Sequence, residues 1–142
     1  MNHLCTVSDS KYVWQGMVLY ESLKRHSRDI VLHYYCINDE SYEIVNQFKD
    51  ENLKVYKVDD LVAKDELKNT EYPYFCWSLA SYLSNKMLET DIDAVTYVDS
   101  DIYFHKSINT IFEEIGDRDV GIFRHRQFSL TTNHIEGHYN VG

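Results

Sequence analysis

Hydrophobic and polar positions change their spacing along this chain in a way that predicts strands and helices in alternation. Short apolar, β-branched or aromatic runs predict strands at residues 4–7, 30–37, 54–58, 94–98, 102–104 and 119–123. Apolar positions at helical spacing predict helices at residues 11–26, 41–50, 74–88 and 108–115. Residues 59–72 are more highly charged and predict a short helix with a loop. This β-α-β-α-β order predicts an α/β fold with a largely parallel sheet flanked by helices.

Two of the predicted helices show which of their side chains should face the sheet. In the segment 11–26 the apolar positions are Trp14, Met17, Val18, Leu19 and Leu23. Asp9 or Ser10 is expected to cap the start of this helix through its side-chain oxygen. In the segment 74–88 the inward positions are expected to be Leu79, Leu83, Met87 and Leu88.

Length and charge narrow the class of protein. A chain of 142 residues predicts one domain that can bury a real core. Fourteen Lys and Arg against 23 Asp and Glu give a net charge of −9, which disfavours nucleic acid and anionic membrane as main partners. A phosphate-bearing ligand would therefore need local positive charge or a metal ion at its site.

Cysteine usage and the absence of targeting signals predict a cytoplasmic location. The chain has three cysteines, an odd number without CxxC spacing, and Cys5 and Cys36 fall in predicted strands. Free thiols in a reducing compartment are the expected state. The N-terminus lacks the basic and apolar regions of a signal peptide, and no apolar stretch approaches the ~20 residues that span a bilayer.

The most informative motif is an acidic pair, Asp99-Ser100-Asp101, placed directly after the apolar run 94–98. Ligands of open parallel sheets bind at the carboxyl ends of the strands. Two carboxylates at such an edge repel each other unless a cation lies between them, and Mg²⁺ or Mn²⁺ prefers oxygen ligands that include phosphate. A metal ion there would join an acidic protein to a diphosphate. The alternative is a solvated turn, since Asp-Ser-Asp also suits turns.

From these residues the chain resembles the GT-A-fold glycosyltransferases, in particular the family 8-like group that uses nucleotide-diphospho-sugars. Residues 5–12 look like the opening strand and nucleotide-base loop of that family. Residues 95–104 are similar to its strand, Asp-x-Asp, strand signature. Residues 139–142, Tyr-Asn-Val-Gly, look like the start of its Asn-x-Gly strand beside the donor sugar. The resemblance implies a Rossmann-like GT-A fold with a mixed, mainly parallel sheet, incomplete at the C-terminus, and residues 1–142 as the N-terminal portion of a nucleotide-sugar-binding domain.

The resemblance also implies roles for individual residues. Val7, Ser8 and Asp9 would line the base, Asp9 accepting a hydrogen bond from a uracil-type N–H, and Tyr12 would stack on the base. Asp99 and Asp101 would hold the metal, with Asp99 and Ser100 also close to the ribose or diphosphate. Asn140 would face the donor sugar. Each assignment has a structural alternative: Asp9 as a helix cap, Tyr12 as a packing residue and Asn140 as a turn residue.

The chain departs from the family pattern at several positions. The family's arginine before the acidic pair is missing, since the region reads Ser81-Tyr82-Leu83. Arg124 and Arg126 could supply positive charge for phosphate instead, or could belong to a solvated loop. The family's third metal ligand, a histidine, and the residues near the reacting carbon of the sugar would lie further downstream, so the catalytic residues are unknown.

The resemblance implies a metal-dependent transfer of a sugar, hexosyl transfer by expectation, from a nucleotide-diphospho-sugar, in particular a UDP-sugar. The acceptor would be a saccharide or a lipid-linked saccharide, with peripheral membrane contact through a C-terminal region outside this chain. Mn²⁺ or Mg²⁺ would be the cofactor, and this portion alone could bind donor without turning it over. Two alternatives are a haloacid-dehalogenase-like phosphohydrolase, which also carries Asp-x-Asp after a strand, and a non-catalytic nucleotide- or metal-binding module.

Overall fold

The computed structural model describes residues 1–62, 71–118, 123–124 and 139–140. Two compact units are present, residues 1–108 and residues 109–142, and each is described by itself. The first unit holds the elements β1 (Asn2–Ser8), α1 (Val13–His26), β2 (Ile30–Cys36), α2 (Asp39–Val45), β3 (Leu53–Lys57), the short 3-10 helix η1 (Val58–Asp60), α3 (Tyr72–Leu88) and β4 (Val95–Tyr97). The second holds α4 (Asn109–Ile115), β5 (Phe123–Arg124) and β6 (Tyr139–Asn140).

The first unit is built on a four-stranded parallel sheet in the order β3-β2-β1-β4. Strand β1 pairs with β2 over its whole length, from Asn2 opposite Ile30 to Ser8 opposite Cys36, and pairs with β4 on its other side. Parallel strands need helical crossovers, and the alternation of strands and helices in the sequence provides them. The predicted parallel α/β sheet is therefore confirmed.

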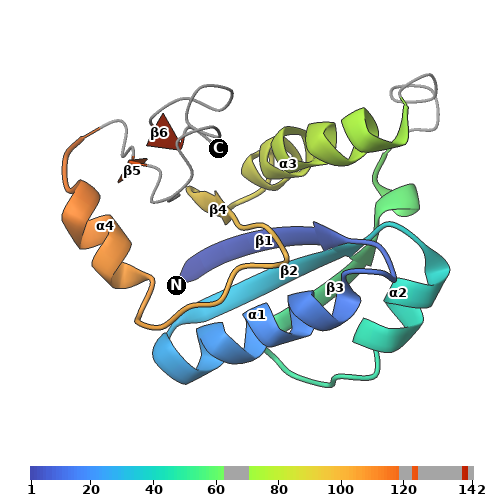
Figure 1. Ribbon diagram of the computed structural model, residues 1–142, viewed down its shortest axis with the longest axis horizontal. Coiled ribbons are helices and arrows are strands. Elements are labelled where there is room, and N and C mark those ends of the chain that lie inside the picture. The colour runs from blue at the N-terminus through green and yellow to red at the C-terminus, as the bar shows by residue number, and fades with distance from the viewer. Residues whose placement is uncertain (63–70, 119–122, 125–138, 141–142) are drawn as a thin grey trace, which may run out of the picture. The chain divides into compact units, whose positions relative to one another are not determined.

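Helices cover both faces of this sheet (Figure 1). Helices α1 and α2 contribute to one apolar cluster, in which Leu23 and Val45 pack with strand residues such as Leu4 and Leu32. Helix α3 contributes Leu79 and the other residues on its inward face to a second cluster with the opposite faces of the strands. The two central strands, β1 and β2, are thus covered on both faces. This explains why their apolar residues form runs and do not simply alternate with polar residues.

The inward faces of the helices differ from the sequence prediction in three positions. Met17, Leu19 and Leu23 of α1 are buried as expected, but Trp14 is 60% exposed and Val18 is 53% exposed. Helix α3 buries Leu79, Leu83 and Met87, whereas Leu88 is 48% exposed. These three residues were assigned inward only because they are hydrophobic. In α1 the buried side also includes Val13, Gly16 and Tyr20.

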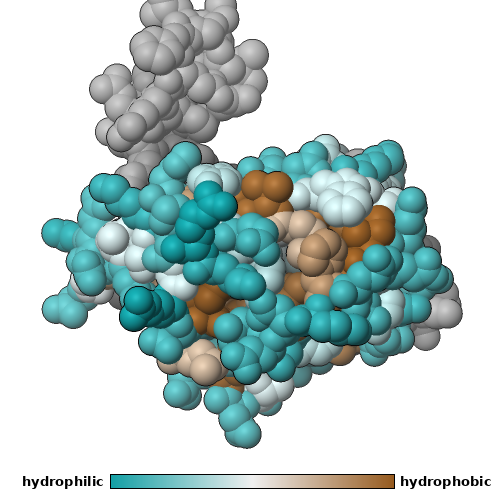
Figure 2. All heavy atoms as spheres, turned by 90° about the horizontal axis from the view of Figure 1, so that it is seen from below, coloured by the Kyte–Doolittle hydropathy of each residue, from teal (hydrophilic) through white to brown (hydrophobic). Residues whose placement is uncertain are grey.

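Figure 2 shows the molecule from below the view of Figure 1, from the side of α1 and α2. Hydrophobic residues, in brown, gather in small areas between hydrophilic residues, in teal. Exposed apolar side chains scattered in this way are ordinary on a protein surface.

Two helix starts also differ from the prediction. Helix α1 begins at Val13 with Tyr12 as its N-cap residue, and neither Asp9 nor Ser10 caps it through a side chain. Helix α2 begins at Asp39, before the predicted position, because Asn38 and Ser41 form a reciprocal capping box.

The predicted strand at residues 102–104 is wrong, and the reason lies in α1. The backbone N–H of Phe104 donates to Ser22 Oγ at 3.0 Å, and that of Ile108 donates to Ser27 Oγ at 3.1 Å. Phe104 and Ile108 are buried in the cluster beneath α1. The segment after the acidic pair therefore returns along α1 with serine hydroxyls in place of a strand ladder.

The second unit contains α4 and a short antiparallel pair, in which Phe123 lies opposite Asn140 and Arg124 opposite Tyr139. Helix α4 ends at Ile115 and is followed by Gly116, whose φ of +55° is the left-handed conformation that favours glycine after a helix end. Helix 108–115 was predicted, and β5 falls at the end of the predicted strand 119–123, of which residues 119–122 lie outside the described part. The prediction of a single domain over residues 1–142 stays a prediction.

All three cysteines are free, with Cys5 and Cys36 buried and Cys76 partly buried. Burial raises the pKa of Cys36 to about 12, so this thiol stays protonated. No helix in the described ranges is both long and apolar enough to cross a bilayer.

Candidate functional site

The carboxyl ends of β1 and β4 lie next to each other and bring two sequence motifs together. The pairing of these strands continues past β4, where the N–H of Val98 donates to the carbonyl of Cys5 at 2.9 Å. On the other side of β1 the N–H of Ile37 donates to the carbonyl of Ser8 at 3.0 Å. The loop after β1 and the acidic pair after β4 therefore leave the same edge of the sheet, where ligands of parallel sheets bind.

A cavity of about 340 Å³ opens at this edge. It is lined by the two loops, by the end of β2 and by the first turns of α3: Val7, Ser8, Asp9, Tyr12, Ile37, Tyr72, Cys76, Trp77, Tyr97, Asp99, Ser100 and Asp101. Every residue within 1–101 that was predicted from the sequence to bind nucleotide or metal lines this cavity. We call this cavity the strand-end pocket.

The acidic pair forms a turn, in which the N–H of Ile102 donates to the carbonyl of Asp99 at 3.2 Å. Asp99 and Asp101 are exposed, while Ser100 between them is only 9% exposed. Burial, and then the charge of the Asp99 carboxylate, raises the pKa of Tyr97, which also lines the pocket. The solvated-turn alternative is thus correct about the backbone, yet the turn presents both carboxylates to the strand-end pocket rather than to open solvent alone.

Asp9 follows β1 and is nearly buried, at 8% exposure. Its Oδ1 accepts hydrogen bonds from the backbone N–H groups of Lys11 at 2.9 Å and Tyr12 at 3.3 Å. Its Oδ2 accepts a hydrogen bond from the Tyr72 hydroxyl at 2.7 Å. Asp9 therefore shapes the turn that precedes α1 without being its N-cap. Tyr12, which this turn presents to the pocket, is 51% exposed.

Ser8 is tied to α1 by a buried tyrosine. The Ser8 and Tyr34 hydroxyls are 2.7 Å apart, and the Tyr34 hydroxyl also donates to the carbonyl of Val13 at 3.4 Å. Burial raises the pKa of Tyr34 to about 12, so it keeps its proton. This link positions the end of β1, and so one wall of the strand-end pocket, against the start of α1.

Five residues of the strand-end pocket were not predicted from the sequence: Ile37, Tyr72, Cys76, Trp77 and Tyr97. Three of them come from the start of α3, where Tyr72 was predicted to belong to the short helix and loop at 59–72 and where the helix predicted at 74–88 was given only packing residues. A signal existed there, since Tyr72, Tyr74 and Trp77 are concentrated within one and a half turns and fall outside the apolar face. These aromatic side chains are 53%, 56% and 70% exposed.

Three predicted site residues are not brought to the strand-end pocket by the described structure. Arg124 and Asn140 belong to the second unit, where β5 and β6 pair them into one small ribbon. Arg126 lies outside the described residues. Their roles toward phosphate and donor sugar stay predictions.

Among the residues that the structure describes, no group of three or more His, Cys, Asp and Glu side chains could hold a metal ion. Of the three carboxylates that line the strand-end pocket, Asp9 already accepts three hydrogen bonds, whereas Asp99 and Asp101 lie two residues apart on one turn. Any cation held there would take its remaining ligands from water or from a bound molecule.

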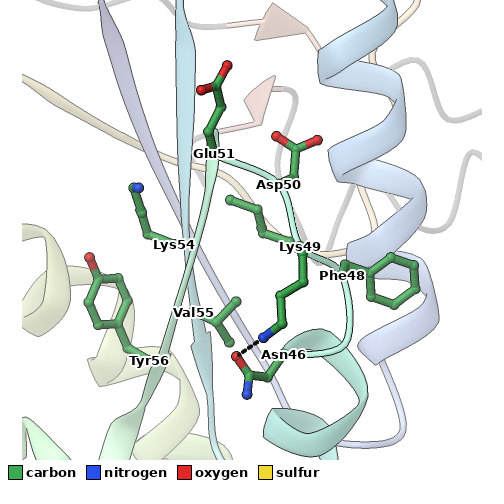
Figure 3. Close-up of a pocket in the computed structure, with 9 residues that line it drawn as sticks. Asn46, Phe48, Lys49, Asp50, Glu51, Lys54, Val55 and Tyr56 are labelled. Atoms are coloured by element: carbon green, nitrogen blue, oxygen red, sulfur yellow. Dashed lines mark hydrogen bonds between the residues drawn. The ribbon is translucent and has the colours of Figure 1, made fainter.

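A second cavity, of about 480 Å³, lies along β3 at the edge of the sheet (Figure 3). Its polar groups do not converge: Lys49 contacts Asn46, the Asp50 and Glu51 carboxylates point away from them, and Lys54 lies on the other side of β3 from Val55. Asp50 is engaged by Lys24, which lowers its pKa to about 2. The arrangement of these side chains favours the strand-end pocket as the functional site.

The fold is that of a GT-A-like, Rossmann-like α/β protein. In structure the chain is similar to the galactosyltransferase LgtC, which was crystallised in complex with donor and acceptor sugar analogues. The TM-score is 0.55 at 14% sequence identity, and the match covers 95% of this chain and 49% of LgtC. At this identity the likeness shows the fold, and it favours the predicted GT-A architecture over that of the phosphohydrolase alternative.

Two curated proteins of Bacillus subtilis (strain 168), both described as uncharacterised, are similar in sequence. YfnF is 25% identical over an alignment of 127 positions that covers 84% of this chain, and YfnD is 22% identical over an alignment of 147 positions that covers 99% of it. The chain spans 41% and 47% of their respective lengths. No protein-family model matches the chain.

Proposed function

We propose that this chain provides the donor-binding half of a metal-dependent glycosyltransferase and binds the nucleoside diphosphate of a UDP-sugar in the strand-end pocket. One observation carries the proposal. The loop after β1 and the Asp99-Ser100-Asp101 turn, which are 90 residues apart in the sequence, line the same cavity at the carboxyl edge of a GT-A-like sheet. Nucleotides bind at this edge in open α/β folds.

The pocket divides into a base end and a phosphate end. Asp9, nearly buried and held by three donors, is placed to accept an N–H of the base, and the half-exposed ring of Tyr12 is placed to stack on it. Val7 and Ser8 complete the wall beside the base. Ser100, buried between the two carboxylates, lies against the ribose or diphosphate.

Asp99 and Asp101 are the residues that would hold Mn²⁺ or Mg²⁺. The donor set suits such an ion, because hard divalent cations are commonly bound by one or two carboxylates together with substrate phosphates and water. When bound, the ion neutralises charge that builds on the departing diphosphate. The protein itself orients the donor through Asp9, Tyr12 and the turn, and a chain of net charge −9 has reason to use a cation for a diphosphate.

The remaining assignments concern the donor sugar and the acceptor. We place Asn140 beside the donor sugar and Arg124 and Arg126 near phosphate, with a saccharide or lipid-linked saccharide as acceptor. The backbone pairing of β5 with β6 brings Arg124 and Asn140 onto adjacent strands, which supports a shared role. Hexosyl transfer, peripheral membrane contact and a cytoplasmic location stay predictions.

The proposal is tested by incubating the full-length protein with a panel of UDP-hexoses and Mn²⁺ and measuring the release of UDP. Loss of a residue that only hydrogen-bonds to a metal ligand lowers activity by roughly 10–100-fold. Asp101→Asn removes a proposed ligand itself, so it should reduce the rate of UDP release by more than that. Asp93→Asn serves as the control. Asp93 is an exposed aspartate shortly before β4 and is outside the strand-end pocket. Release of UDP that Asp101→Asn leaves unchanged would remove the role assigned to the acidic pair.

A further inference from the structure

Helix α3 reaches into the strand-end pocket through its first residue. Tyr72 begins the helix, and Cys76 and Trp77 follow one turn later on the side that lines the cavity. Tyr72 contacts Asp9, a residue 63 positions earlier in the chain, through a hydrogen bond of 2.7 Å. The bond joins the helix on one face of the sheet to the loop that leaves β1.

The Asp9 carboxylate is surrounded by donors. Two backbone N–H groups bind Oδ1, and the Tyr72 hydroxyl binds Oδ2. A carboxylate offers about four lone-pair positions, so these three donors leave about one free, on the side of Oδ2. Burial and the Asp9 charge raise the pKa of Tyr72, so its hydroxyl keeps its proton and donates.

One free acceptor position matches a base that presents one N–H. A uracil-type ring presents a single imide N–H at its pairing edge, whereas cytosine presents a lone pair at the same ring position. The lone pair of cytosine would face the carboxylate acceptor without a proton between them, which is the kind of mismatch that gives strong discrimination. The number and direction of free acceptor positions on Asp9 would thus decide which base is bound.

We propose that Tyr72 is a positioning residue for base specificity. Its hydroxyl fixes the Asp9 carboxylate, so that one acceptor lone pair faces the pocket and selects an imide N–H. The inference rests on the proposed function, since it assumes that a nucleotide occupies the pocket, but it assigns a role to α3 that the sequence motifs do not.

The test compares UDP and CDP binding, each with Mn²⁺, to full-length wild type and Tyr72→Phe by calorimetry. We expect UDP affinity to fall by about tenfold, the worth of one hydrogen bond to a charged group, while CDP affinity stays the same or rises. The ratio of the two affinities should therefore fall by at least tenfold. Tyr74→Phe is the matched control, because Tyr74 is in the same turn of α3 at similar exposure but does not line the cavity.

A second variant separates positioning from a general effect on the helix. Asp9→Asn should abolish the preference for UDP, and adding Tyr72→Phe to it should change the UDP-to-CDP ratio no further, because the two residues act through one bond. Equal loss of affinity for both nucleotides in Tyr72→Phe, or a preserved ratio, overturns the inference while leaving the proposed function intact. Failure of the wild type to bind either nucleotide overturns both.

Discussion

At the scale of single residues, the close approach of Tyr34, and not an unusual backbone conformation, explains why position 16 is a glycine. A Cβ at this position would lie 2.0 Å from the Tyr34 hydroxyl, and Tyr34 is fully buried and bonded to Ser8. Because Tyr34 is fully buried, its ring can move away only by displacing the residues packed around it. The sequence shows only a glycine within a helix, so this contact was not predictable from periodicity.

We therefore expect Gly16→Ala to destabilise the protein. Overpacking of a tight core costs about 1–3 kcal/mol, which exceeds the roughly 1 kcal/mol that alanine gains over glycine in a helix. Urea unfolding measures the net effect. Gln15→Ala, at the exposed neighbouring position, should stay within about 0.5 kcal/mol of wild type, and a stabilised Gly16→Ala would contradict the contact with Tyr34.

A second residue-scale prediction concerns His33, which is 8% exposed. Its ring lies 3.0 Å from a nitrogen of His3 and 3.3 Å from the Tyr56 hydroxyl. Burial, then the positive charges of His3 and Lys54, lower the pKa of His33 from 6.5 to about 4. The folded state therefore favours the neutral ring, whereas the unfolded chain takes up a proton as pH falls below about 6.5.

This histidine should make stability fall between pH 6.5 and pH 4, with no further loss from it below that range. Between pH 7 and pH 4.5 its share is about 2 kcal/mol, at 1.36 kcal/mol per pKa unit. Urea unfolding at both pH values should show a smaller loss in His33→Gln than in wild type. An unchanged slope in His33→Gln would contradict the neutral buried ring.

At the scale of elements, the sequence predicted which segments are strands and helices because burial on both faces leaves long apolar runs and one-sided packing leaves helical spacing. It predicted the segment 102–104 wrongly as a strand. Only Phe104 of its three apolar residues is buried, and the N–H of Phe104 donates to Ser22 of α1 instead of to a neighbouring strand. Helix α3 also shows that local spacing does not reveal contacts with distant segments. Spacing identified its inward residues, but nothing local says that Tyr72 and Trp77 meet the ends of β1 and β4.

The start of α2 provides an element-scale prediction. Asn38 Oδ1 accepts from the N–H of Ser41 at 2.9 Å, and Ser41 Oγ accepts from the N–H of Asn38 at 3.4 Å. Asn38→Ala removes the side-chain half of this box and should lower the free energy of unfolding by about 1 kcal/mol. Thermal or urea unfolding measures it against Glu43→Ala, an exposed position within the same helix. Equal effects of the two variants would show that the cap contributes nothing.

At the scale of the whole molecule, the parallel sheet converts distant sequence positions into one site. Asp9 and Asp99 could be paired from the sequence only through the family resemblance and the rule that ligands bind at strand ends. The structure supplies the cavity that joins them, together with the hydrogen bond from Tyr72 that holds the Asp9 carboxylate. The sequence shows a concentration of aromatic residues around Tyr72, but which strand ends these side chains meet depends on the assembled fold.

The charge of the whole molecule makes the central claim measurable. An acidic chain whose phosphate end carries Asp99 and Asp101 should repel a nucleoside diphosphate unless a divalent cation joins them. The most direct measurement is a calorimetric titration of the full-length protein with UDP, with and without Mn²⁺, in wild type and in a variant carrying Asp99→Asn and Asp101→Asn. We expect UDP to bind wild type at least about tenfold more tightly with Mn²⁺, a difference of about 1.4 kcal/mol, and the variant to lose that difference. UDP binding of equal strength with and without Mn²⁺, or an undiminished Mn²⁺ effect in the variant, would contradict the account.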